Sequence, residues 1–95
     1  MQYITFMHNN VKSQPSDKDW QHFFEIANQS GLFRGGSAIG KRTTIGKDGI
    51  PDITSHIGGY MRFDAESLDE LTELMNQHPV VLHGGTVEIC ELPQS

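Results

Sequence analysis

The sequence lacks the features of secreted, membrane-spanning and nucleic-acid-binding proteins. Its single cysteine, Cys90, cannot close an internal disulfide, so a reducing cytoplasm is the expected compartment. No apolar run approaches the roughly 18–20 residues that cross a bilayer. The first residues lack both the basic region and the apolar stretch of a signal peptide. Lysine and arginine number seven against twelve aspartates and glutamates, for a net charge of −5. We therefore expect no membrane and no nucleic-acid partner, because nucleic acids bind chiefly to basic surfaces.

The chain is also short of apolar residues. Its 95 residues make a single domain, residues 1–95, of which 36% are hydrophobic. A domain of this size buries only about 60–65% of the surface that its unfolded chain exposes. Association with a second copy would bury more apolar surface and cover strand edges. We therefore expect a homodimer.

Apolar periodicity, turns and capping residues predict the element order β-α-β-β-α-β. A first helix should span residues 17–30, between the N-cap Ser16 and the stop signal Gly31. A second helix should start at Ser67, which forms a capping-box pattern with Glu70, and end at Pro79. Strands are expected at 3–8, within 32–45, at 56–64 and at 86–92. This order predicts a ferredoxin-like α+β fold, an antiparallel sheet with both helices on one face.

Alternation along the strands sorts their side chains onto two faces of the sheet. The purely apolar set is expected under the helices: Ile4, Phe6, Ile57, Met61, Phe63, Val87 and Ile89. The mixed set is expected on the open face: Tyr3, Thr5, Met7, Tyr60, Arg62, Thr86, Glu88 and Cys90. Such an aromatic face needs a cover. It is either a subunit interface alone or a ligand pocket that the dimer encloses.

Three stretches resemble a known family. Residues 57–70, IGGYMRFDAESLDE, resemble the "GGYYLI…DSLDEA" of the DGPF branch of the YCII-related family. His78-Pro79 with GGTVEI at 84–89 resembles its "CP…GGTVEVRP" ending, and Trp20 with Gly31-Leu32 and Gly35-Gly36 resembles its "W…G.L..GG". The resemblance covers most of the chain and is most specific over residues 57–89.

The resemblance implies a ferredoxin-like dimer that packs sheet face to sheet face, with a pocket near its centre and no settled activity. Some members are proposed enzymes built on a histidine of the first helix and a nearby aspartate. A few are associated with lyase-like or dehalogenation chemistry, and others lie beside sigma-factor regulators. Here Trp20 takes the histidine position, residues 36–40 contain no carboxylate, and Asp48-Gly49-Ile50-Pro51 is a degraded signature. We therefore do not expect this protein to use the acid–base chemistry of that histidine and aspartate.

The residues expected to bind a ligand are taken mainly from the open face and its rim. They are Tyr3, Trp20, Arg34, His56, Tyr60, Arg62 and Glu88. Arg34 lies beside two glycines, and an arginine can grip a carboxylate at two points, so a small organic acid is the expected ligand. His56 and His8 are the candidate proton carriers, because an imidazole can exchange protons near neutral pH.

The sequence predicts no metal site and no cofactor, because it contains no HxH, CxxC or HExxH motif. The leading interpretation is a YCII-related, dimeric small-molecule-binding module without established catalytic activity. One alternative is a small lyase or isomerase that acts on an oxygenated organic acid. Another is a regulatory or structural interaction domain whose open face is only an interface.

Overall fold

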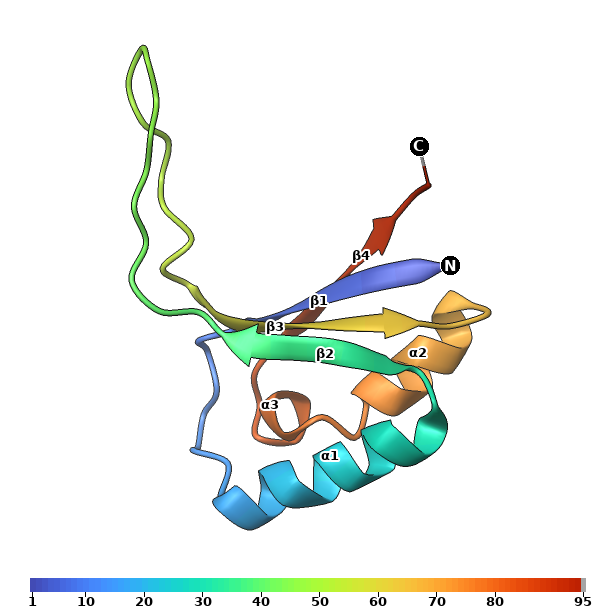
Figure 1. Cartoon of the computed structure of the whole chain (residues 1–95). Coiled ribbons are helices and arrows are strands. Elements are labelled where there is room, and N and C mark those ends of the chain that lie inside the picture. The colour runs from blue at the N-terminus through green and yellow to red at the C-terminus, as the bar shows by residue number, and fades with distance from the viewer. Residues whose placement is uncertain (95) are drawn as a thin grey trace.

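A computed structural model describes residues 1–94, which fold into one sheet and three helices (Figure 1). In chain order the elements are β1 (Gln2–His8), α1 (Asp17–Ser30), β2 (Phe33–Ala38), β3 (Ile57–Asp64), α2 (Leu68–Met75), α3 (Pro79–Leu82) and β4 (Val87–Leu92). The strand order is β2-β3-β1-β4, and every neighbouring pair is antiparallel. This confirms the predicted ferredoxin-like α+β fold.

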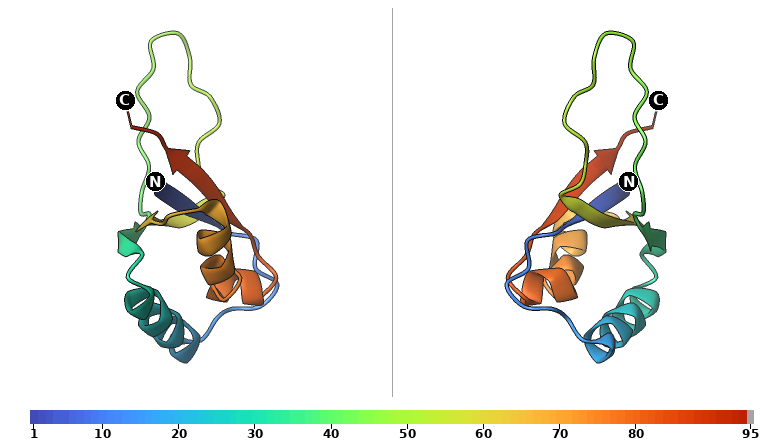
Figure 2. Two further views of the ribbon diagram at one scale, coloured as in Figure 1. Left: turned by 90° about the vertical axis from the view of Figure 1, so that its right-hand side faces the viewer. Right: turned by 90° about the vertical axis from the view of Figure 1, so that its left-hand side faces the viewer.

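The helices lie on one side of the sheet and leave the other side bare (Figures 1 and 2). Both crossovers, β1-α1-β2 and β3-α2-β4, pass over the same face, as right-handed connections require. Within the described part of the chain, no helix is long and apolar enough to cross a bilayer.

The bounds of α1 agree with the prediction because the chain signals both ends. The Ser16 hydroxyl accepts from the Asp19 N–H, and the Asp19 carboxylate accepts from the Ser16 N–H. At the other end Gly31 has φ of 75°, a left-handed conformation that glycine adopts without strain.

The second helical region differs from the prediction at its end. Ser67 caps α2 as expected, but α2 stops at Met75. Pro79 does not end this helix; it begins the separate one-turn helix α3, with His78 as N-cap. Proline suits a first helical position because the N–H that it lacks would have no partner there.

The face prediction for β1 is wrong. Tyr3 pairs with Phe63 and Thr5 with Met61, so Tyr3, Thr5 and Met7 face the helices and are buried. Ile4 and Phe6 lie on the bare face instead. Thr5 tolerates burial because its hydroxyl donates to the Met61 carbonyl at 3.1 Å. Alternation in β1 alone does not show which of its faces lies under the helices, because both faces carry large apolar side chains.

β2 approaches β3 closely. Arg34 and Gly35 together oppose Arg62, which makes a bulge, and Gly35 has φ of 109°. A β-carbon on Gly36 would collide with the Tyr60 carbonyl oxygen and the Met61 backbone. The β2–β3 pairing therefore requires glycine at position 36.

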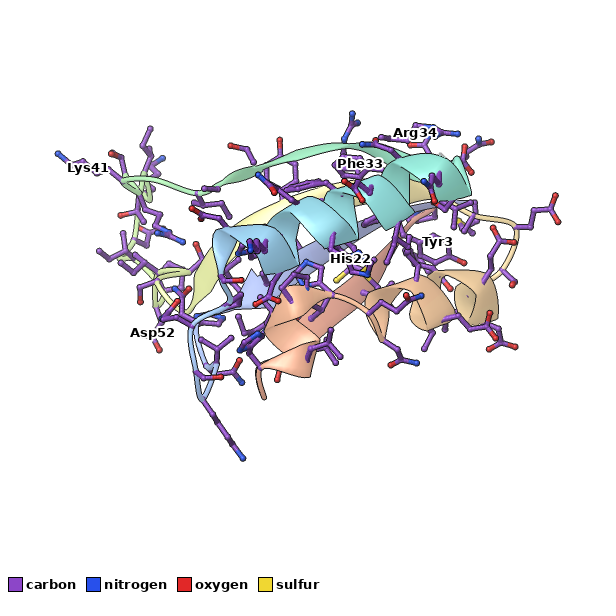
Figure 3. The ribbon with its side chains drawn as sticks, turned by 90° about the horizontal axis from the view of Figure 1, so that it is seen from below. Tyr3, His22, Phe33, Arg34, Lys41 and Asp52 are labelled. Carbon is purple, nitrogen blue, oxygen red and sulfur yellow. The ribbon has the colours of Figure 1, made fainter. Side chains whose placement is uncertain are left out.

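The connection between β2 and β3, residues 39–56, projects on the side of the sheet away from the helices (Figures 1 and 2). The Arg42 guanidinium ties its base together by donating to the carbonyls of Gly40 and Ile57. Beyond this base Ile45 is 99% exposed. Figure 3 shows Lys41 and Asp52 in this projection, well away from α1.

Candidate functional site

A cleft of about 570 Å³ lies between α1 and the sheet. Its apolar lining comes from both layers: Met7, Trp20, Phe24, Phe33, Met61 and Val80. This volume and this lining are typical of small-molecule sites, which combine apolar walls with a few polar groups.

The polar groups of the cleft are mostly uncharged. They include His8, Asn9, Gln14 and Ser37. Tyr60 also borders the cleft, but its side chain lies on the bare face, opposite Phe6. Within residues 1–94, no lysine, arginine, aspartate or glutamate lines the cleft. A ligand that carries a full charge would therefore lose its hydration without gaining an ion pair.

Glycines form part of the cleft's sheet-side wall. Gly36, Gly58 and Gly59 all line the cleft. A β-carbon on Gly59 would lie 3.1 Å from the Ser37 carbonyl oxygen and 3.3 Å from Met7 Cε. The absence of side chains at these positions lets the neighbouring strand and loop approach closely at this wall.

The wall beside the start of α1 is held by a hydrogen-bonded network. His83 contacts Ser13 Oγ through Nδ1 at 2.8 Å and Asp19 Oδ2 through Nε2 at 3.0 Å. The Ser16 backbone N–H lowers the pKa of Asp19 most, with help from the Ser16 hydroxyl and from His83. Because His83 precedes β4, these contacts fasten the loop after β1 to the loop before β4.

A histidine–carboxylate pair joins β1 to β4. His8 Nε2 lies 2.9 Å from Glu88 Oε1, and this hydrogen bond is the main cause of the lowered pKa of Glu88. The His56 ring centroid is 5.5 Å from that of His8. Burial, and then the charge of Glu88, raises the pKa of the Cys90 thiol. Cys90 is therefore a poor nucleophile, since the thiolate is the reactive form.

The expected ligand-binding residues do not form one site. Trp20 lines the cleft, together with His8. Tyr60 borders the cleft, but its side chain lies on the bare face, where it pairs with Phe6. Arg62 and Glu88 lie on the bare face, because they pair with Ile4 and Phe6. His56 lies beside His8, directly before the first residue of β3.

Two of the expected residues have other roles. Tyr3 is not on the bare face; it is 4% exposed within the core, and Figure 3 shows it between α1 and α2. Arg34 lies at the outer edge of the sheet, where its guanidinium donates to the carbonyls of Gly31 and Phe33. It does not line the cleft.

Sequence reasoning missed His78 as a functional candidate. Its side chain is 0% exposed and packs against Trp20 and Phe23, with ring centroids 5.2 and 4.6 Å away. Nδ1 accepts from the Val80 N–H, whereas Nε2 is buried without a hydrogen-bond partner. Burial lowers the pKa of His78 to about 4. The only sequence signal was its place before Pro79, which is typical of an N-cap.

No cluster of three or more potential metal ligands occurs among residues 1–94. No family model matches the chain, and no curated protein matches it either. Among solved structures it resembles a 5-chloro-2-hydroxyhydroquinone dehydrochlorinase, TftG, from Burkholderia phenoliruptrix AC1100, in complex with 2,5-dihydroxybenzoquinone. The identity is 13% and the TM-score 0.49, over 100% of this chain and 96% of the other. A likeness at this level says nothing about the chemistry of this chain.

The burial of neutral His78 predicts acid-sensitive stability. The unfolded chain protonates this imidazole near pH 6.5, but the folded chain does so only near pH 4. Between these values the unfolded state binds more protons, so the free energy of unfolding falls as the pH decreases, by up to about 3 kcal/mol. Urea unfolding from pH 7.5 to 4.5 measures this loss. The variant His78→Asn should flatten the profile, and an unchanged profile would contradict the assignment.

Proposed function

We propose that this chain is a small-molecule-binding module whose ligand occupies the cleft between α1 and the sheet. The observation that carries the proposal is the cleft itself, about 570 Å³ with apolar walls and a few polar groups. The hydrogen-bonded network of His83 supports it, because a wall that is fixed before binding loses little conformational entropy on binding.

The ligand is uncharged and mostly apolar, with at least one flat face. Trp20, Phe24 and Phe33 offer aromatic surface, and none of the residues that line the cleft is a lysine or arginine. The organic acid that Arg34 led us to expect would therefore find no lysine or arginine in this cleft to form an ion pair with its carboxylate. It stays a prediction for the outer surface only.

The module works as a homodimer in the cytoplasm, as a YCII-related domain of the DGPF type. Ile4 and Phe6 lie on the bare face beside Tyr60 and Cys90, and no helix covers them. Arg62 and Glu88 lie on the same face, and a sheet face with apolar and aromatic side chains that no helix covers is typical of a protein interface. A second copy presents the same face and would bury both.

Replacement of Trp20 should remove most of the binding of an uncharged probe. We expect wild-type protein to bind 1-N-phenylnaphthylamine with increased probe fluorescence, and Trp20→Ala to bind about tenfold more weakly, since a buried tryptophan often carries a large share of the binding energy. His22→Ala is the control, because His22 is exposed. Equal affinity in wild type and Trp20→Ala would contradict the proposed site.

A charge on the bare face should split the dimer. We expect wild-type protein to sediment as a dimer and Phe6→Glu as a monomer, because the carboxylate would be buried unpaired between two sheets. The matched control, Leu82→Glu, changes a leucine of α3 that is 68% exposed and should stay dimeric. A wild-type monomer in sedimentation velocity would refute the dimer.

A second candidate function is a lyase or isomerase, and the His8–Glu88 pair favours it. Glu88 holds His8 through Nε2, so the imidazole proton lies there and Nδ1 is left to accept another. His8 also lines the cleft. His8 could remove a proton from carbon next to a ligand carbonyl, while Glu88 stabilises the imidazolium that forms.

Isotope exchange tests this second function. We expect wild-type protein to speed the exchange of the methyl protons of acetophenone with deuterium oxide, followed by NMR. His8→Gln should lower the protein-dependent rate by about 100-fold, the usual minimum for loss of a general base. His56→Gln is the neighbouring control. Proton transfer by His8 would be ruled out if wild-type protein exchanged the protons no faster than buffer. It would also be ruled out if His8→Gln exchanged them as fast as wild type.

A further inference from the structure

His78 contains a buried hydrogen-bond donor without an acceptor. Nδ1 accepts from the Val80 N–H at 3.1 Å, so in the neutral ring the proton lies on Nε2. Nε2 has no hydrogen-bond partner among the residues that the structure describes, and the whole side chain is 0% exposed. Buried donors nearly always have an acceptor, so an orphaned one needs an explanation.

This donor lies directly behind the wall of the cleft. The ring of His78 meets that of Trp20 edge to face, at an interplanar angle of 89° and a centroid distance of 5.2 Å. The ring also packs against Phe23, with centroids 4.6 Å apart, and Nδ1 accepts from the Val80 N–H. Trp20 and Val80 both line the cleft. His78 itself does not line the cleft, so these neighbours separate its imidazole from the cleft.

We propose that the Nε2–H of His78 is a specificity-determining donor that selects ligands with an uncharged acceptor oxygen on an otherwise apolar frame. This inference rests on the proposed binding function and names its ligand class: aromatic ketones, esters and quinone-like carbonyl compounds. The oxygen enters between Trp20 and Val80 and accepts from Nε2, and the apolar frame stays against Phe24 and Phe33.

The chemistry of the wall favours a neutral oxygen over a carboxylate. The pKa of His78, lowered to about 4 by burial, keeps the imidazole uncharged at neutral pH. Like the cleft, it therefore offers a hydrogen bond without a positive charge. A carbonyl oxygen costs much less to desolvate than a carboxylate and can accept the same bond.

Two probes of nearly the same shape test this selection. Acetophenone has a carbonyl oxygen where α-methylstyrene has a methylene group. The experiment measures the dissociation constant of each probe by the fluorescence of Trp20, the only tryptophan in the sequence, and compares the two as a ratio. Relative to wild type, the preference for acetophenone should fall roughly fivefold to tenfold in variants that lack Nε2, the usual worth of one hydrogen bond.

Two variants remove the Nε2–H in different ways, and only His78→Phe removes every side-chain donor, because asparagine carries amide N–H groups of its own. His78→Phe fills the same space, whereas His78→Asn keeps an acceptor for the Val80 N–H. His22→Phe is the matched control and should keep the wild-type ratio. An unchanged ratio in both His78 variants would overturn the inference and leave the binding function intact. If neither probe binds the wild type, the proposed function fails as well.

A measurement on the unaltered protein covers the case in which both variants fail to fold. In wild-type protein with 15N-labelled histidine, the His78 Nε2–H resonance should move downfield with acetophenone and stay in place with α-methylstyrene. A resonance that stays in place while acetophenone saturates the protein would show that the aromatic rings satisfy this donor, and would overturn the inference.

Discussion

The register between β1 and β3 decides which side chains face α1 and which are left for another molecule. Thr5 opposite Met61 places Met7 and Met61 beneath α1, where both line the cleft. Phe6 opposite Tyr60 places an aromatic pair on the bare face. A slip of one residue would exchange these sets. The Thr5 hydroxyl secures the register, because it donates to the Met61 carbonyl inside the core.

The cleft exists because α1 is held at both ends rather than packed flat along its length. Its N-terminus is fixed by the Ser16–Asp19 box and by His83, and its C-terminus by Gly31. Between these ends Phe23 and Ala27 are buried, whereas Trp20 and Phe24 line the cleft. Gly36 and Gly59 line the opposite wall, where a β-carbon on either would press against a neighbouring strand. The cleft therefore lies between a helix that is fixed at both ends and a sheet wall that includes these two glycines.

Local signals predicted most of the fold, and tertiary pairing decided most of the site. Ser16 and Gly31 mark α1 because caps act within one turn of the chain. The faces of β1 could not be predicted in the same way, since both faces carry large side chains that can be buried: Tyr3 and Met7 on one, Ile4 and Phe6 on the other. Tyr3, which was expected to line the pocket, therefore lies in the core. The cleft itself lies on the helix side of the sheet and not on the bare face. His78 gave almost no signal because its importance comes from burial against Trp20 and Phe23, which lie far away in the sequence.

The central claim is that a ligand binds between α1 and the sheet and not on the bare face. Mapping amide chemical shifts during titration with 1-N-phenylnaphthylamine tests it most directly. The account predicts the largest changes at Gly36, Gly59 and the indole N–H of Trp20, with Arg62 and Cys90 little affected. Changes centred on Arg62, Glu88 and Cys90, with Gly36 and Trp20 unmoved, would contradict it.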